Sequence, residues 1–294
     1  MNKWIAHYNN IENSDYNLFC FPYTGGSASY FAPWINEMPE NVGIAPVLYP
    51  MRETRFTEPL MNTVEEMAAA LVEDSIDLFR KPFAFYGHCS GAVIAYETAV
   101  VLKKKYDIAP LLFTAASAQS PRNTPTNPDV MKMSDSELAE YAVKLGMLDR
   151  ELVSNQEFMA YYFHIFKADF LMIFNYNTNK TERIDCPILA ITGKDDAFLN
   201  RKSIEDWSSY TDELEVMETD GEHFFGDAGR VQDGHFERSY KDKYEQNWTM
   251  NLYAENVIQN INNQNYYGYK DYFITCFSSE GCRAGRHRGP AVPS

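Results

Sequence analysis

The sequence predicts an α/β protein built on a mostly parallel sheet with helices on both faces. Short apolar runs typical of buried strands alternate along the chain with helical patterns, and two helical stretches near the middle have no strand between them. Such alternation with continuous apolar strands is typical of parallel sheets, because helices cover both of their faces. We therefore expect one large domain that carries a helical insertion.

Apolar runs that end at glycine, proline or polar residues mark the expected strands. They span residues 17–22, 44–49, 83–87, 111–117 and 187–193, and the more polar segment 213–221 is the last strand candidate. Apolar residues at helical spacing indicate helices over 63–79 and 92–106, and Thr63 with Glu66 forms a capping box at the start of the first. The repeated order of strand, helix and strand predicts the parallel sheet.

The middle of the chain departs from this alternation. Residues 134–148 and 155–176 both have helical patterns, so we expect an insertion at about 120–183 that covers the carboxyl ends of the strands as a lid. We place a single domain over residues 1–262, with a polar insert at about 226–247. Residues 263–294 are expected to be a C-terminal extension that is disordered or partly non-native, because its end is rich in Arg, Gly and Pro.

Composition excludes several classes of protein. The 294-residue chain is 45% hydrophobic and has a net charge of −15, which argues against nucleic acid and anionic membranes as partners. The sequence has no apolar run of transmembrane length, no apolar signal core at its start and no disulfide pattern among its five cysteines. We expect a cytoplasmic protein without metal or cofactor, because neither metal-ligand spacing nor a phosphate-binding loop occurs.

The most informative segment is FAFYGHCSGAVIAYE, in which GHCSG occupies residues 87–91 between a strand and a helix. A sharp strand-to-helix turn around G-x-nucleophile-x-G presents the central side chain above the sheet, at the amino end of a helix. The central residue is Cys89, and a thiol suits direct attack because part of it is ionised near neutral pH. Ser90 is the weaker candidate, since centring the motif on it would put His88 and Ala92 where the glycines belong.

A nucleophile in this setting needs an acid and then a histidine further along the chain. The fifth expected strand ends in GKDD, which offers Asp195 or Asp196, and the sixth ends in a turn that leads to His223. Both segments reach the sheet edge where Cys89 is expected, and the pattern does not choose between the two aspartates. His235, in a DGHF segment, competes with His223.

Two backbone amides at the same edge suit an oxyanion hole. One is the amide of Ser90, and the other comes from Tyr23 or Thr24 in the glycine-rich turn after the first strand. Together these features predict attack by Cys89 with the help of a general base, followed by an acyl-Cys89 intermediate.

Six segments follow one another along the chain: FCFPYTGGSASYF, FAFYGHCSGAVIAYE, MSDSELAEYAVKLGM, ADF (residues 168–170), ITGKDD and DGEHFF. In this order they resemble the type II thioesterases of nonribosomal peptide and polyketide synthesis, over residues 17–226 and a closing helix at about 251–262. The resemblance implies an α/β-hydrolase fold with a helical lid. It also implies hydrolysis of acyl groups from the phosphopantetheine arms of acyl or peptidyl carrier domains by a monomeric enzyme.

The resemblance places the nucleophile on Cys89, the aspartate on Asp196 and the histidine on His223, with oxyanion amides near Thr24 and on Ser90. That family normally has serine where this chain has Cys89. A thioester on Cys89 is more reactive toward amines and thiols than an ester, so transfer or cyclisation of the acyl group is an alternative to hydrolysis. A serine-to-cysteine exchange made to trap an acyl-enzyme would leave the same sequence.

Two other interpretations stay open. Polyester synthases and dienelactone-type hydrolases also use cysteine in this fold, but neither accounts for the combination of FP-x-x-GG and GxDD. The non-enzymatic alternative is a carrier-binding scaffold with a decayed site, although Asp196 and His223 are still present to assist a thiol.

Overall fold

The computed structural model describes residues 2–224 apart from residues 8, 37, 126–128, 145, 146 and 200. In this part of the chain a six-stranded sheet has the order β2-β1-β3-β4-β5-β6, and all neighbouring strands are parallel. The strands are β1 (Tyr16–Phe21), β2 (Val42–Pro46), β3 (Phe83–His88), β4 (Phe113–Ala116), β5 (Ile188–Gly193) and β6 (Leu214–Thr219). The predicted α/β fold with a parallel sheet is confirmed.

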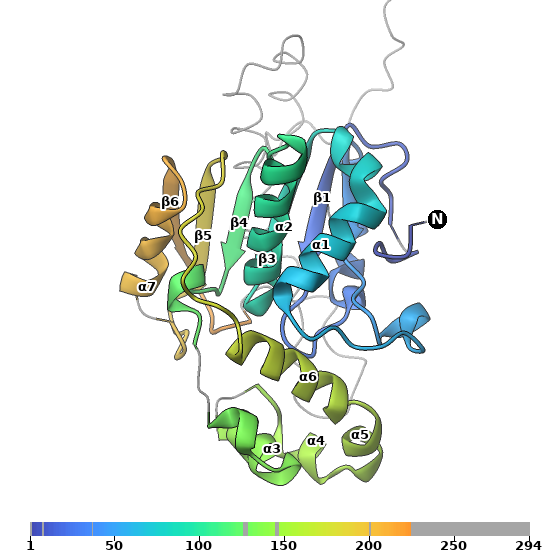
Figure 1. Cartoon of the computed structure of the whole chain (residues 1–294), viewed down its shortest axis with the longest axis vertical. Helices are drawn as coiled ribbons and strands as arrows, with labels where there is room; N and C mark the ends of the chain where they lie inside the picture. Colours follow the sequence, from blue (N-terminus) through green and yellow to red (C-terminus); the bar gives the residue numbers. More distant parts are fainter. Residues whose placement is uncertain are drawn as a thin grey trace, which may run out of the picture.

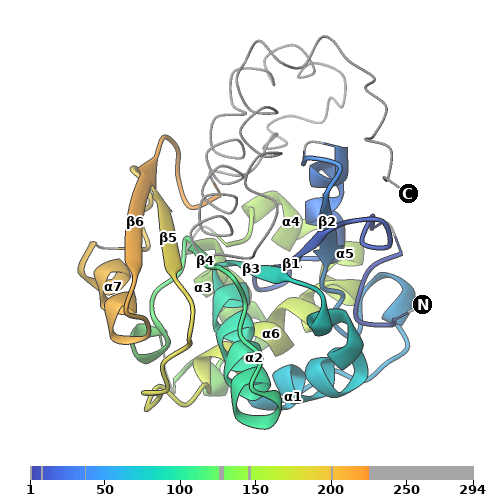
Figure 2. The ribbon, with the colours of Figure 1, turned by 90° about the horizontal axis from the view of Figure 1, so that it is seen from above.

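Helices lie against the sheet and beyond one of its ends (Figure 1). The α-helices are α1 (Val64–Ser75), α2 (Ser90–Tyr106), α3 (Asp135–Lys144), α4 (Arg150–Ser154), α5 (Gln156–Tyr161), α6 (Phe163–Phe174) and α7 (Arg201–Glu205). The 3₁₀ segments are η1 (Ala28–Asn36), η2 (Glu53–Arg55), η3 (Ile76–Arg80), η4 (Pro121–Asn123), η5 (Val130–Lys132) and η6 (Asp206–Ser209). Helices α1 and α2 lie side by side on the same face of the sheet (Figure 2).

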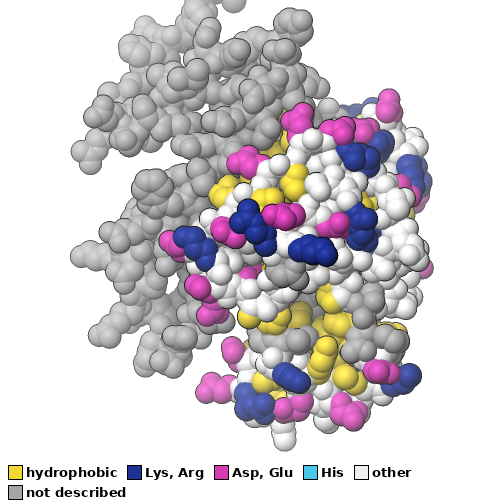
Figure 3. Space-filling model, turned by 90° about the vertical axis from the view of Figure 1, so that its left-hand side faces the viewer, with side chains coloured by type: hydrophobic (Ala, Val, Ile, Leu, Met, Phe, Trp, Pro, Cys, Tyr) yellow, Lys and Arg dark blue, Asp and Glu magenta, His cyan; other side chains and the backbone are white. Residues whose placement is uncertain are grey.

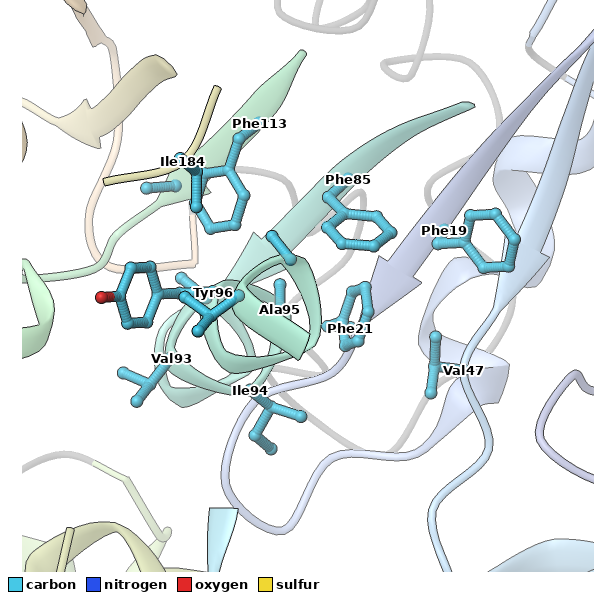
Figure 4. Packing of buried hydrophobic residues seen from close by; sticks show 14 of the residues in the cluster. Phe19, Phe21, Val47, Phe85, Val93, Ile94, Ala95, Tyr96, Phe113 and Ile184 are labelled. Carbon is cyan, nitrogen blue, oxygen red and sulfur yellow. The ribbon is translucent and has the colours of Figure 1, made fainter. Parts of the chain in front are cut away.

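The apolar strands supply side chains to both faces. Phe19, Phe21 and Phe85 belong to the large cluster between the sheet and α2 (Figure 4), and the rings of Phe21 and Phe85 meet at 5.1 Å. On the opposite face Tyr86 packs on Trp34 of η1, with ring centroids 4.8 Å apart. Because β1 to β5 are buried on both faces, these strands carry mostly apolar residues at successive positions, whereas the edge strand β6 is partly exposed and contains two glutamates.

The order of the strands brings the ends of β1 and β3 together. The chain passes from β1 to β2 at one edge, returns to β3 on the other side of β1, and continues to β6. The loops after β1 and β3 therefore leave the sheet where the strand order reverses. In open α/β sheets this is the place where ligands bind.

The segment between β4 and β5 contains the predicted helical insertion. Helices α3 to α6 lie beyond the carboxyl ends of the strands (Figure 1) and share an apolar cluster that includes Leu138, Phe166 and Phe170. The helical stretch expected over 155–176 forms two helices, α5 and α6, with Tyr162 between them. The hydroxyl of Tyr162 donates a hydrogen bond to the carbonyl oxygen of Gly25, so the break coincides with a contact to the loop after β1.

Smaller differences concern the ends of elements. The strand expected over 44–49 ends at Pro46, after which Val47 forms an isolated antiparallel bridge with Ile5. The predicted cap at Thr63 is confirmed, because its Oγ1 accepts a hydrogen bond from the amide of Glu66 at 3.1 Å. The helix expected over 63–79 becomes α1 followed by the 3₁₀ segment η3.

Several sequence predictions fall outside the described residues. They are the polar insert at 226–247, the closing helix, the C-terminal extension over 263–294, and His235. Within the described ranges, none of the helices combines the length and the apolar character needed to cross a membrane.

We expect Phe85→Ala to lower the free energy of unfolding by about 3–5 kcal/mol, because the ring is fully buried between the sheet and α2. Phe56→Ala is the control, since that ring is 55% exposed and its loss should cost less than about 1 kcal/mol. Urea denaturation of both variants measures the difference. Equal losses in the two variants would contradict the described core.

Candidate active site

Cys89 lies in the sharp turn between β3 and α2. Its backbone has φ +52° and ψ −121°, a conformation that costs energy for a residue with a Cβ. The flanking glycines make the turn possible, since a Cβ on Gly87 would lie 2.3 Å from the Cα of Ala92, and one on Gly91 would lie 2.2 Å from the carbonyl oxygen of Phe21. The strained turn thus fixes Cys89 at the carboxyl edge of the sheet.

The two neighbouring candidates for the nucleophile have different surroundings. Cys89 is partly exposed, whereas Ser90 is 7% exposed and its Oγ accepts a hydrogen bond from Oγ1 of Thr24 at 2.9 Å. The Ser90 hydroxyl is therefore engaged by the loop after β1, and the geometry favours Cys89. The same contact brings together Thr24 and Ser90, the two residues expected to supply oxyanion amides.

His223 and Asp196 meet as the sequence led us to expect. Nδ1 of His223 lies 2.8 Å from Oδ2 of Asp196, and Cys89 lies close enough to the side chain of His223 to raise its pKa. Asp195 is exposed to solvent, and its amide donates to the carbonyl oxygen of Gly221 at 3.0 Å. Of the two aspartates that the pattern left open, Asp196 is the one whose carboxylate reaches the histidine.

The loops that carry Asp196 and His223 are fastened to each other through their backbones. The amide of Lys194 donates to the carbonyl oxygen of Thr219 at 2.9 Å, just after the paired ends of β5 and β6. A Cβ on Gly193 would lie 2.3 Å from the carbonyl oxygen of Glu222, so only glycine permits this approach. The first residue of the GKDD segment therefore has a steric role.

No sequence pattern singled out Ser117, which contacts both loops. It directly follows β4, is 1% exposed and has φ +45°. Its Oγ donates to the carbonyl oxygen of His223 at 2.7 Å and lies within hydrogen-bonding reach of the Asp196 carboxylate. A polar residue immediately after a buried strand, at the edge where the site was expected, was the signal that could have identified it.

The surroundings of His223 favour its protonated form. Burial lowers its pKa, but hydrogen bonds to Asp196 and Cys89, together with their charges, outweigh burial and raise the pKa to about 10. Burial pushes the pKa of Asp196 upward, yet the hydrogen bond and charge of His223 and a hydrogen bond from the Phe198 amide keep that pKa below its ordinary value. Both shifts favour an imidazolium on His223 beside the carboxylate of Asp196.

His88 packs beneath this site. Its fully buried ring stacks on Phe224 at 5.2 Å and meets the edge of His223 at 5.7 Å. Burial, and secondly the charge of His223, lower the pKa of His88 to about 3, so it is neutral at pH 7. It supports the ring of His223 by packing.

Two other cysteines differ from Cys89. Cys20 and Cys186 are buried, and burial raises the pKa of both thiols above the ordinary value.

In the part of the chain that the structure covers, no three His, Cys, Asp or Glu side chains are grouped so that they could hold a metal ion.

The parallel sheet, the strained turn at Cys89 and the helical insertion are those of an α/β hydrolase. A family model for the thioesterase domain matches residues 16–233, and the chain therefore belongs to the thioesterase family. It is similar to the gramicidin S biosynthesis protein GrsT of Aneurinibacillus migulanus, with 28% identity over 226 residues that cover 76% of this chain and 88% of GrsT.

Two solved structures support this assignment. The RedJ thioesterase from the prodiginine pathway of Streptomyces coelicolor is 27% identical, with a TM-score of 0.67 over 74% of this chain and 87% of RedJ. The type II thioesterase BorB from the borrelidin biosynthetic cluster is 25% identical, with a TM-score of 0.66 over 75% of this chain and 90% of BorB.

Asp196→Asn should lower the pKa of His223 from about 10 toward its ordinary value of 6.5, because the opposing effect of burial remains while the carboxylate is lost. NMR titration of the ring measures this pKa. Asp195→Asn is the matched control, since its exposed side chain leaves the value unchanged. An Asp196→Asn protein whose His223 titrates like that of the wild type would disprove the assigned contact.

The same raised pKa predicts a pH-dependent stability. Protonated His223 stabilises the folded chain fully below pH 6.5, the ordinary value, and this contribution is lost as pH rises toward 10. The free energy of unfolding, measured with urea across this range, should therefore fall more steeply in the wild type than in Asp196→Asn. Parallel curves for the two proteins would contradict the prediction.

Proposed function

We propose that this protein is a thioesterase that removes acyl groups from the phosphopantetheine arms of carrier domains, in nonribosomal peptide or polyketide biosynthesis, through an acyl-Cys89 intermediate. The observation that carries the proposal is the hydrogen bond of His223 with Asp196 beside Cys89, at one sheet edge of a thioesterase-family chain. The gramicidin S, prodiginine and borrelidin pathways named for its relatives support the class of partner.

In the first step the thiolate of Cys89 attacks the thioester carbonyl of the substrate. We propose that His223, whose pKa is raised by its contacts with Asp196 and Cys89, enters this step protonated and paired with the attacking sulfur. When the tetrahedral adduct collapses, the carbon–sulfur bond to pantetheine breaks. The departing sulfur takes the proton of His223, which leaves acyl-Cys89 and a neutral histidine.

Acylation prepares His223 for the second step. The hydrogen bond and the charge of Cys89 both raise the pKa of His223, and acyl-Cys89 supplies neither in the same form. The pKa of His223 therefore falls once Cys89 is acylated, and the neutral ring can take a proton from water. The resulting hydroxide attacks the acyl carbon, the acid is released, and the Cys89 thiolate is restored beside a protonated His223.

The negative charge on the carbonyl oxygen needs two donors during both steps. We assign them to the backbone amides of Thr24 and Ser90, whose side chains are in contact at 2.9 Å. The neighbouring amide of Gly25 already donates to Asp169 at 2.8 Å, so it does not compete with the amide of Thr24 for this role.

Apolar contacts are better suited than charge to attract the carrier domain. The chain has a net charge of −15 and carrier domains are usually acidic, so long-range attraction is absent. Hydrophobic side chains gather where the insertion meets the sheet body (Figure 3). Within the insertion, Tyr161 is 60% exposed to solvent and Leu152 is 39% exposed. We propose that the carrier domain docks beside the helical insertion. We also propose that the protein is a cytoplasmic monomer and needs no cofactor of its own.

Cys89→Ala should lower the rate of carrier deacylation by at least about 10³-fold, because the covalent route is lost. Intact-protein mass spectrometry of enzyme and acyl-loaded carrier follows both partners. The wild-type carrier loses its acyl group and Cys89 transiently gains it, whereas the carrier stays loaded with the variant. Cys186→Ala is the control and should retain activity, since this thiol is buried away from the site.

The fate of the acyl-enzyme separates the alternatives in the same experiment. Release as the free acid supports hydrolysis, whereas an amide or new thioester formed with an added amine or thiol supports an acyltransferase or cyclase. Full activity of Cys89→Ala would overturn the proposed mechanism. Carrier binding without any acyl loss in the wild type would point to a scaffold.

A further inference from the structure

We propose that Asp169 and Tyr162, which belong to the helical insertion, hold the oxyanion loop (residues 23–26) in its active shape, with Arg52 as the countercharge of Asp169. The lid and the oxyanion hole then form a single unit. This inference rests on the proposed function, because it assigns these residues to the support of the acyl-transfer step. They are positioning residues and do not contact the reacting atoms.

Both backbone polar groups of Gly25 are held by side chains from the insertion. Its amide donates to Oδ2 of Asp169 at 2.8 Å, and its carbonyl oxygen accepts from the hydroxyl of Tyr162. Tyr162 directly precedes α6 and Asp169 lies seven residues further on, about two helical turns along the same face. Together the two side chains fix the orientation of Gly25 through both its amide and its carbonyl group. Loops on protein surfaces more often leave such groups to water.

Arg52 fastens the same loop from the other side. Its guanidinium forms an ion pair with Asp169, and the two side chains are only 4% and 7% exposed. Nε of Arg52 also donates to the carbonyl oxygen of Gly26 at 2.9 Å, and Nη1 donates to that of Pro50 at 2.9 Å. The buried carboxylate of Asp169 is thus paired with the guanidinium of Arg52, which is itself hydrogen-bonded to the loop. A buried charge is stable in a protein only when it is paired in this way.

The insertion also packs directly on the loop. Gly25 has φ +72°, and a Cβ there would lie 3.0 Å from Cδ2 of Phe166 and 3.0 Å from the hydroxyl oxygen of Tyr162. The next residue back, Thr24, reaches Ser90 beside the nucleophile at 2.9 Å. Contacts therefore run without interruption from α6 through Gly25 and Thr24 to the turn that carries Cys89.

The structure shows what the residues of the ADF segment (168–170) contact. Phe170 is buried in the apolar cluster of the insertion, whereas Asp169 faces the oxyanion loop. The segment thereby connects the core of the lid to the loop that supplies an amide to the developing oxyanion. A shift of α6 would move both hydrogen-bond partners of Gly25 together.

The test compares acyl transfer with alkylation of the same thiol. Transfer from an octanoyl thioester of N-acetylcysteamine needs the oxyanion hole, whereas alkylation of Cys89 by iodoacetamide develops no oxyanion. Asp169→Ala should lower kcat for the thioester by about 10- to 100-fold with KM changed less than about threefold, because the donor is displaced only partly. The alkylation rate should stay within about twofold of the wild type.

Two further variants complete the experiment. Lys167→Gln is the matched control, since Lys167 lies on α6 and pairs with exposed Asp135 instead of with the loop. It should leave kcat unchanged. Tyr162→Phe removes only a hydroxyl and should lower kcat by about three- to tenfold. This variant tests the inference if Asp169→Ala does not fold.

The outcomes separate this inference from the proposed function. If Asp169→Ala and Tyr162→Phe both have the same kcat as Lys167→Gln, the inference is overturned while the proposed function stands. A parallel fall in alkylation and acyl transfer would also overturn it, because it would indicate general damage to the site. A wild-type Cys89 that accepts no acyl group from the thioester would overturn the proposed function, and the inference with it.

Discussion

The site depends on the close approach of backbone segments at the carboxyl edge of the sheet. At Gly87, Gly91 and Gly193 a Cβ would come within 2.2–2.3 Å of another segment's backbone. Two of these positions form the turn at Cys89, and the third lets the histidine loop rest on the aspartate loop. Without these approaches, the thiol, imidazole and carboxylate would not come close to one another. The polar contacts of the site therefore depend on the close packing of the backbone.

In the proposed mechanism, electrostatics then sets the order of the proton transfers. A buried histidine ordinarily favours its neutral form, but a carboxylate on one side and a thiol on the other reverse that preference in His223. The reversal depends on the state of the thiol, so the chemistry at Cys89 itself alters the basicity of the ring. His88 and Ser117 contribute by packing and backbone contacts that keep this ring in place.

The sequence was informative wherever a feature is local. Buried strands have continuous apolar runs, the cap at Thr63 is a short motif, and the turn at Cys89 lies between adjacent elements. The break at Tyr162 and the support from Ser117 were missed, because each depends on a partner distant in sequence. The pairing of Arg52 with Asp169 joins residues 117 positions apart, and no periodicity indicates such a contact.

The long separation between the oxyanion loop and its supports has a consequence for folding. Gly25 meets Tyr162 and Asp169 across 137 and 144 residues, and contacts across such distances form late because large loops must close first. Synthesis from the N-terminus completes the turn at Cys89 before any of these supports emerge from the ribosome. Under the proposed mechanism, the nascent chain carries its thiol before the contacts that support the oxyanion loop, and activity begins only after the helical insertion has packed on that loop.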